Sequence, residues 1–157
     1  MRYPQLVVLE FDGWLSRQLG ELARLRRWLL REARQLGAAR NLLAPNRPTV
    51  LVAQFDPRRE KTDALQFLAD AHLTRPDVAT LAVSDVKLND DGDRSRWTET
   101  VLDLGARAVM FPPLTRPVLE DVVGRMMTAV LTRTRPGWTP PEGKGDVIDL
   151  AEEGQAE

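Results

Sequence analysis

The chain has 157 residues, 43% of them apolar, which is the length of one ordinary domain with enough apolar side chains to fill a core. Its 22 basic and 23 acidic residues give a formal net charge of −1, which argues against a protein that grips nucleic acid along its whole length. It has no cysteine, which excludes disulfides, thiolate metal sites and cysteine nucleophiles. The first apolar run is far shorter than the roughly 20 residues of a membrane span, so we expect a cytoplasmic protein that binds neither nucleic acid nor a membrane.

A buried strand and an amphipathic helix are predicted first. Residues 6–9 form a compact, partly β-branched run, which is typical of a strand buried on both faces of a parallel sheet. Leucines then recur every third or fourth residue from Leu15 to Leu22, so a helix that begins near Trp14 would bury one stripe. Asp12 is the best candidate to cap its start.

The segment that follows this helix is ambiguous. Residues 28–30 are apolar and lie between two arginines, which fits a short strand. The same leucine-rich sequence also fits a continuation of the first helix as far as Leu36. We predict the strand, with the single long helix as the alternative.

Three later apolar runs are clearer. Residues 49–53, 78–83 and 106–111 are short and each follows a proline or glycine break, which predicts three buried strands. Helical patterns follow each of them, and their apolar positions are Leu65, Leu68 and His72; Trp97, Val101 and Leu104; and Val118, Val122, Met126 and Ala129. This alternation predicts a parallel sheet covered on both faces, with functional groups at the carboxyl ends of its strands.

The character of the chain changes near its end. From residue 132 prolines and glycines replace the periodic pattern, and the last residues are mainly acidic or small. We therefore predict one domain over residues 1–131 and a flexible tail over 132–157, first Pro/Gly-rich and then acidic. Residues 146–150 are either a recognition motif that orders on binding or the beginning of a solubilising end.

Short motifs near the strand ends carry a family resemblance. Arg75-Pro76-Asp77-Val78 leads into the strand that ends before Ser84, and Gly105-Ala106 leads into the last strand. With the order of the elements over residues 4–131, these motifs resemble the receiver domain of bacterial response regulators, the CheY-like domain of two-component signal transduction. The resemblance implies an α/β, flavodoxin-like fold: a five-stranded parallel sheet with helices on both faces, followed here by a disordered C-terminal tail.

The residues that carry phosphotransfer in this family are changed here. An acidic pair at the end of the first strand holds magnesium in the family, and the matching positions are Glu10 and Phe11, followed by Asp12. The phosphoaccepting aspartate is matched by Gln54, whose carboxamide cannot form an acyl phosphate. Ser84 agrees with the family, whereas its lysine is matched by Pro112, and the peptide before Pro113 is expected to be cis. The resemblance thus implies a degenerate phosphoacceptor pocket made of Glu10, Phe11, Asp12, Gln54, Ser84 and Pro112.

Other polar residues have structural explanations. Glu10 and Asp12 are the candidate metal ligands, but a cap at the helix start explains them as well, and we predict no metal and no cofactor. Asp56 lies two residues after Gln54 and precedes a proline, which favours a turn. The acidic run 89–93 lacks the closing glutamate of a calcium loop and is interpreted as a solvated loop. His72, the one histidine, is interpreted as a structural residue at a helix end rather than a catalytic one.

Two parts of the sequence are candidates for binding surfaces. Six arginines between residues 24 and 40 form either a solvated charged face or a site for an acidic partner. The last predicted helix has a wide apolar sector, and receivers, by resemblance, pair through their fourth helix, fifth strand and fifth helix. We therefore expect a homodimer or a protein partner there, unless the tail folds back over this sector through Trp138. The predicted interaction surface comprises Trp97, Val109, Leu119, Val123 and Met127.

These features predict a stand-alone, receiver-like signalling protein, not an enzyme, that acts by phosphorylation-independent protein–protein interaction. One alternative is a small-molecule sensor that uses the degenerate pocket for an uncharged polar ligand. A second alternative is a conventional phosphoaccepting response regulator. A flavodoxin-like enzyme is the weakest alternative, because no motif for a cofactor is present.

Overall fold

Strands and helices alternate along the chain in a computed structural model that describes residues 3–43, 47–58 and 63–134. The predicted tail from residue 135 onward lies outside the described residues, whereas residues 132–134 belong to the last helix. The elements are β1 Gln5–Leu9, α1 Trp14–Arg26, β2 Leu29–Ala33, α2 Leu36–Leu43, β3 Thr49–Phe55, α3 Asp63–Thr74, β4 Ala79–Ser84, α4 Asp91–Asp103, β5 Ala108–Met110 and α5 Arg116–Thr134.

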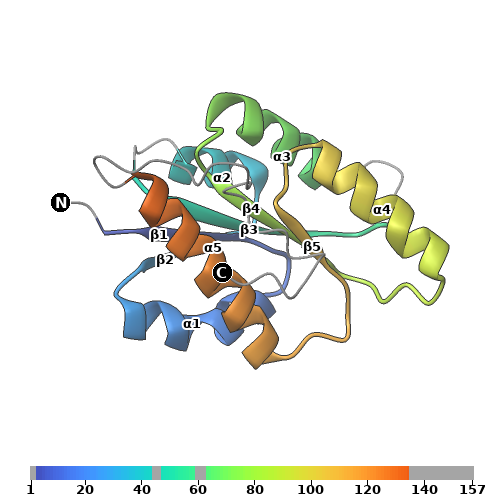
Figure 1. Cartoon of the computed structure of the whole chain (residues 1–157), viewed down its shortest axis with the longest axis horizontal. Helices are drawn as coiled ribbons and strands as arrows, with labels where there is room; N and C mark the ends of the chain where they lie inside the picture. The colour runs from blue at the N-terminus through green and yellow to red at the C-terminus, as the bar shows by residue number, and fades with distance from the viewer. Residues whose placement is uncertain (1–2, 44–46, 59–62, 135–157) are drawn as a thin grey trace.

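The strands form one parallel sheet in the order β2-β1-β3-β4-β5 (Figure 1). This order confirms the predicted flavodoxin-like fold, in which the chain reverses its direction of winding between β1 and β3. The register pairs Gln5 of β1 with Leu29 on one side and with Thr49 on the other, so β1 and β3 start level and β3 extends two residues beyond the end of β1.

Apolar side chains fill the space on both faces of the sheet. Leu6 and Val8 of β1 pack with α1 and α5, whereas Val7 and Leu9 pack on the opposite face with α2 and α3. This two-residue alternation explains why the central strands are largely apolar on both of their faces. The two helix layers hold the carboxyl ends of β1, β3 and β4 at one edge, where loops can form a site.

The ambiguous segment after α1 is a strand, and the long-helix alternative is wrong. Arg27 has a φ of +62°, and its backbone N–H donates to the carbonyl of Arg24 at 3.3 Å, which ends α1. The chain then pairs with β1 as β2. The short helix α2 was not predicted from its sequence, because only Ala39 and Leu43 in it are buried, too few to show a period.

The acidic run 89–93 is only partly a loop. Asp90 is the N-cap of α4, and its carboxylate accepts a hydrogen bond from the backbone N–H of Asp93 at 3.3 Å. The interpretation as a solvated loop is therefore corrected: α4 begins at Asp91, where exposed carboxylates favour the positive end of the helix.

His72 of α3 and Gly105, which lies between α4 and β5, are close neighbours in the fold. His72 lies on the last turn of α3 with its side chain exposed, which fits the predicted position at a helix end. Gly105 has a φ of +114°, and a Cβ there would come within 2.4 Å of the His72 ring. The glycine therefore lets the turn before β5 approach α3 closely.

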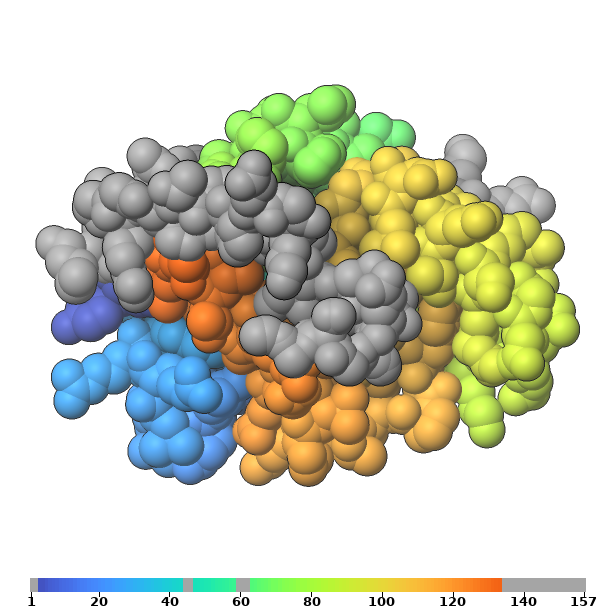
Figure 2. All heavy atoms as spheres, in the orientation of Figure 1, coloured from blue at the N-terminus to red at the C-terminus, as the bar shows by residue number. Residues whose placement is uncertain are grey.

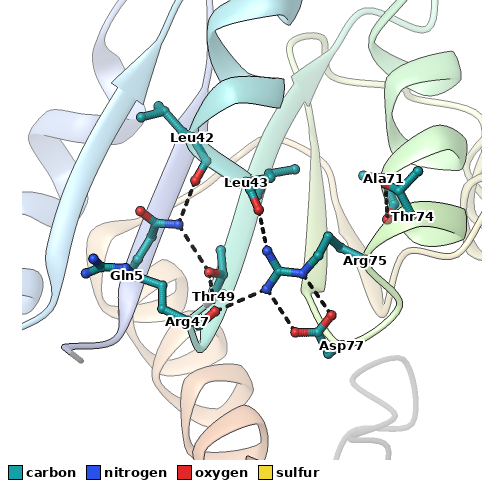
Figure 3. A network of polar contacts seen from close by, with 9 residues as sticks. All are labelled: Gln5, Leu42, Leu43, Arg47, Thr49, Ala71, Thr74, Arg75 and Asp77. Atoms are coloured by element: carbon teal, nitrogen blue, oxygen red, sulfur yellow. Dashed lines mark hydrogen bonds and ion pairs between the residues drawn. The ribbon is translucent and has the colours of Figure 1, made fainter. Parts of the chain in front are cut away.

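An arginine joins several loops at the amino ends of the strands (Figure 3). The guanidinium of Arg75 donates to the carbonyls of Leu43 and Arg47 and to the carboxylate of Asp77. Beside it, the side-chain amide of Gln5 donates to the carbonyl of Leu42 at 2.9 Å and to the hydroxyl of Thr49 at 3.2 Å. This network ties the loop before β3 to the loop before β4, opposite the functional edge.

The network predicts an acid-dependent loss of stability through Asp77. The hydrogen bond from Arg75 lowers the pKa of this carboxyl, while partial burial acts in the opposite direction. Its contribution is therefore present above an unfolded-state pKa of about 3.9 and is lost as the pH falls through the lower folded-state pKa. We expect under about 1 kcal/mol, because the side chain is half exposed.

Urea unfolding from about pH 5 to about pH 3 measures this contribution. Asp77→Asn should flatten that part of the pH profile, whereas Asp103→Asn, at an exposed position at the end of α4, should not. A wild-type profile that the Asp77 substitution leaves unchanged would contradict the assignment.

Candidate functional site

A shallow hollow lies where the carboxyl ends of β3 and β4 meet the loops that follow β1 and β5. Its volume is about 200 Å³ and it opens to solvent. Four of the six residues predicted for the pocket line it, namely Asp12, Gln54, Ser84 and Pro112. The other lining residues are Trp14, Leu15, Val83, Asp85 and Leu114.

Glu10 lies beneath this hollow and is fully buried. Its two carboxylate oxygens accept hydrogen bonds from the backbone N–H groups of Leu15 at 2.6 Å and Ser16 at 2.9 Å. Asp12 accepts a third, from the N–H of Trp14 at 3.1 Å. The predicted capping role is thereby confirmed for both acids, which satisfy three N–H groups in the first turn of α1.

This cap predicts a measurable cost for Glu10→Gln. The substituted amide keeps one acceptor oxygen and turns an NH₂ donor toward a backbone N–H, so we expect a loss of about 1–3 kcal/mol. Glu99→Gln, on the exposed face of α4, is the matched control and should stay within about 0.5 kcal/mol of wild type. Urea unfolding compares them, and an equally small effect at Glu10 would contradict the capping role.

Gln54 connects three strand ends and is almost fully buried. Its side-chain oxygen accepts a hydrogen bond from the backbone N–H of Phe11 at 2.7 Å, beyond the end of β1. Its side-chain nitrogen donates to a carboxylate oxygen of Asp85 at 3.1 Å, beyond the end of β4. The amide therefore holds both neighbouring loops with its own donor and acceptor. We call this arrangement the Gln54 bridge.

Ser84 and Asp56 are also satisfied by their own loops. The hydroxyl of Ser84 donates to the carbonyl of Val86 at 2.7 Å and accepts from its N–H at 3.1 Å. The carboxylate of Asp56 accepts from the backbone N–H of Arg58 at 2.9 Å and from its guanidinium at 3.2 Å, which confirms the predicted turn. This contact raises the pKa of Arg58.

The remaining predicted pocket residues differ in their orientation. Phe11 does not line the hollow, and 53% of its surface is exposed. Pro112 lines the hollow, and its peptide bond to Pro113 is cis, as the resemblance implied. Two carboxylates, Asp12 and Asp85, lie in the lining, whereas lysine and arginine do not.

The residues at the end of β1 do not fit the magnesium site that the family resemblance implies. The carboxylate of Glu10 is turned inward to α1, and Phe11 supplies no oxygen ligand from its side chain. Nowhere in residues 3–43, 47–58 and 63–134 do three or more histidine or acidic side chains gather in a way that could hold a metal ion.

The predicted interaction surface needs correction. Leu119, Val123 and Met127 are fully buried, because α5 packs them against the sheet and α1. Trp97 is partly buried, and its ring centroid lies 6.0 Å from that of Phe55. Figure 2 looks onto the side of the molecule where α4 and α5 come to the surface. Among the described large apolar residues of α5, Val118 is the exposed one, at 49%.

Comparison with known proteins gives relatives by structure alone. No family model matches the sequence, and no curated protein does. A CheY-like receiver domain protein from Methanospirillum hungatei superposes with a TM-score of 0.63 at 14% identity, covering 84% of this chain and 99% of its own. A response regulator from Thermotoga maritima gives 0.62 at 12% identity, covering 81% and 99%. The beryllofluoride-activated NtrC4 receiver domain dimer gives 0.61 at 12% identity, covering 80% and 98%.

Every one of these neighbours is a receiver domain or a response regulator. Among the residues that the structure describes, none of the helices has both the length and the apolar character needed to cross a membrane. The superposition over most of each chain, together with the five-stranded parallel sheet, leads to one conclusion: this protein has the CheY-like fold of response-regulator receiver domains.

Proposed function

We propose that the chain is an atypical receiver-like signalling protein that acts by binding another protein without being phosphorylated. The Gln54 bridge carries this proposal. At the end of β3, where a receiver presents its phosphoaccepting aspartate, this chain presents an amide whose oxygen and nitrogen are both engaged. The bridge holds the loops after β1 and β4 together with no added group.

The chemistry of the hollow supports the same conclusion. Phosphotransfer to a carboxylate needs a nucleophilic oxygen, a divalent cation and donors that stabilise developing negative charge. Here Gln54 offers an amide, Glu10 is engaged by α1, and Pro112 lies where the resemblance expects a lysine. We infer that the protein is not an enzyme and uses no cofactor.

The two alternatives receive less support. A conventional regulator would need another acceptor, and the nearest carboxylate along β3, Asp56, is held by Arg58 and does not line the hollow. A small-molecule sensor would need a pocket of about 300–1,000 Å³ with free polar groups. The hollow has about 200 Å³, and the polar groups of Gln54 and Ser84 are already paired.

The partner surface proposed here is the face made by α4, β5 and α5. The NtrC4 receiver domain that superposes on this chain forms a dimer in its beryllofluoride-activated state. In this chain β5 and α5 expose Val118 and leave Val109, Met110 and Val122 partly exposed. We propose that two copies pair through these side chains, and that pairing needs no phosphoryl group.

Sedimentation velocity over a range of concentrations tests this pairing. We expect a dimer whose population rises with concentration and is unchanged by acetyl phosphate with magnesium. Val118→Glu should weaken the dimer because it places a charge in the contact, whereas Leu25→Glu should not, although Leu25 on α1 is also an exposed apolar residue. Pairing that requires acetyl phosphate, or a monomer at every concentration, would contradict the proposal.

A further inference from the structure

Exposed basic side chains are concentrated in α1, β2, α2 and the segments that join them, at the β2 side of the sheet. Between residues 14 and 43 the chain has seven arginines and two glutamates, a net charge of +5 in a protein whose total is −1. All of these charged side chains are exposed. The surface, called here the basic edge, consists of Arg17, Arg24, Arg26, Arg27, Arg31, Arg34 and Arg40. Figure 2 shows α1 and β2 together at the lower left, with α5 between them and α4.

Most of this charge is not neutralised by the fold. The two glutamates form exposed ion pairs with Arg24 at 2.6 Å and Arg34 at 2.7 Å. For the other five arginines, the described part of the chain provides no carboxylate within ion-pair distance. The basic edge therefore favours an anionic partner over solvent.

The sheet also has an open backbone edge at this position. Within the described residues, β2 is an end strand of the sheet and pairs with β1 alone. The N–H of Leu29 donates to Pro4 at 2.8 Å, and the carbonyl of Ala33 accepts from Glu10 at 3.1 Å, so these two residues face β1. Because alternate residues of a parallel strand face one neighbour, Leu30 and Glu32 direct their backbone groups outward. An extended peptide can pair with both the N–H and the C=O groups of such an edge, whereas the phosphates of a nucleic acid can accept only from the N–H groups.

The chain itself contains a segment of matching chemistry. Residues 142–157 contain six acidic side chains and one lysine, a net charge of −5. The helix before this segment, α5, packs on α1, and its Leu131 contacts the core cluster that contains Trp28. Residues 135–145 extend to at most roughly 36–40 Å, which exceeds the 10–12 Å width of a helix such as α1.

We propose that the acidic segment 146–157 docks as an extended strand along β2 of its own chain, with its carboxylates on the basic edge. Docking covers the outward backbone groups of Leu30 and Glu32, which otherwise offer a template for association between sheets. An acidic segment of another protein would have to displace it, so the segment would act as a built-in competitor. This inference does not rest on the Gln54 bridge or on pairing through α5.

Backbone amide shifts in the full-length chain test the docking. The variant Asp146→Asn/Asp149→Asn/Glu152→Gln/Glu153→Gln keeps the length of the segment and removes four charges. We expect the amides of Leu30, Arg31 and Glu32 to shift by more than a linewidth. Wild type should reach the same shifts at about 1 M salt, where the Debye length is about 3 Å. Arg27→Gln/Arg31→Gln should in turn shift the backbone amides of the acidic segment. The control Arg96→Gln/Arg125→Gln removes the same charge from exposed sites on α4 and α5 and should leave those amides unchanged.

Three outcomes would overturn the docking. The first is that the β2 amides stay unchanged in the four-charge variant, whether or not amides of α4, β5 and α5 move. If the shifts at β2 disappeared on dilution, the occupant would be the segment of a second copy and not of the same chain. If single-stranded RNA moved the β2 amides equally in wild type and in the four-charge variant, the basic edge would be a free nucleic-acid surface.

Discussion

Gln54→Asp is expected to destabilise the protein by about 2–4 kcal/mol at neutral pH and to create a response to magnesium that wild type lacks. The aspartate side chain is shorter than that of glutamine, so it loses the hydrogen bond from the N–H of Phe11. It also places a carboxylate oxygen where the amide NH₂ group donated to Asp85. Two neighbouring carboxylates raise the pKa of one of them, so the loss is largest above that pKa and declines as the pH falls through it. A divalent cation between them should restore part of the stability.

Urea unfolding with and without magnesium measures both effects. Gln66→Asp is a matched control, because the amide of Gln66 also donates to an aspartate, Asp70, at 3.2 Å, but on the exposed surface of α3. We expect this control to change stability by less than about 1 kcal/mol and to ignore magnesium. If both variants behaved alike, the Gln54 bridge would not be the connection that joins the strand ends.

Arg75→Met is expected to cost about 2–4 kcal/mol, which makes it the second large effect. Only 17% of this side chain is exposed, and its guanidinium serves the carbonyls of Leu43 and Arg47 as well as Asp77. Methionine fills a similar volume but leaves both carbonyls without this donor. The cost arises from those unpaired carbonyls more than from the lost charge pair, whose acid is half exposed.

Arg96→Met separates these two contributions. Arg96 also pairs with an aspartate, Asp93, but 69% of its side chain is exposed and it serves no distant loop. The control should change stability by about 0.5 kcal/mol or less in the same urea experiment. A loss at Arg75 as small as that at Arg96 would show that the network in Figure 3 adds little to stability.

The strands themselves could be predicted from the sequence because β1, β3 and β4 are largely apolar on both faces and follow clear breaks, whereas their order in the sheet was implied by the family resemblance. The end of α1 depends on one arginine in a left-handed conformation, which no periodic pattern reveals. The burial of Leu119, Val123 and Met127 was missed for a related reason. Periodicity shows that a helix has a wide apolar sector, but not how much of it the sheet and α1 together cover.

The candidate site, too, could be predicted only in part from the sequence. Its position follows from parallel strands, whose carboxyl ends meet at one edge, and the family resemblance assigned Gln54, Ser84 and Pro112 to that edge. The hydrogen bond from Gln54 to Asp85 was not predicted, because it depends on how two side chains at the strand ends are turned, which no sequence pattern reveals. A cap by Glu10 was predicted, but its partners were not, because the N–H groups that it binds lie five and six residues ahead, a spacing that matches no common capping motif.

The most direct test of the central claim is a titration of the wild-type chain with beryllofluoride and magnesium, followed by backbone amide shifts. The Gln54 bridge predicts no saturable change at Phe11, Gln54, Ser84 or Asp85. The reason is that the amide of Gln54 cannot form an acyl phosphate, nor the corresponding bond to beryllofluoride, and both its polar atoms are engaged. Saturable shifts at these positions would contradict the account. They would show that the hollow accepts a phosphoryl analogue and that the protein works as a phosphorylated receiver.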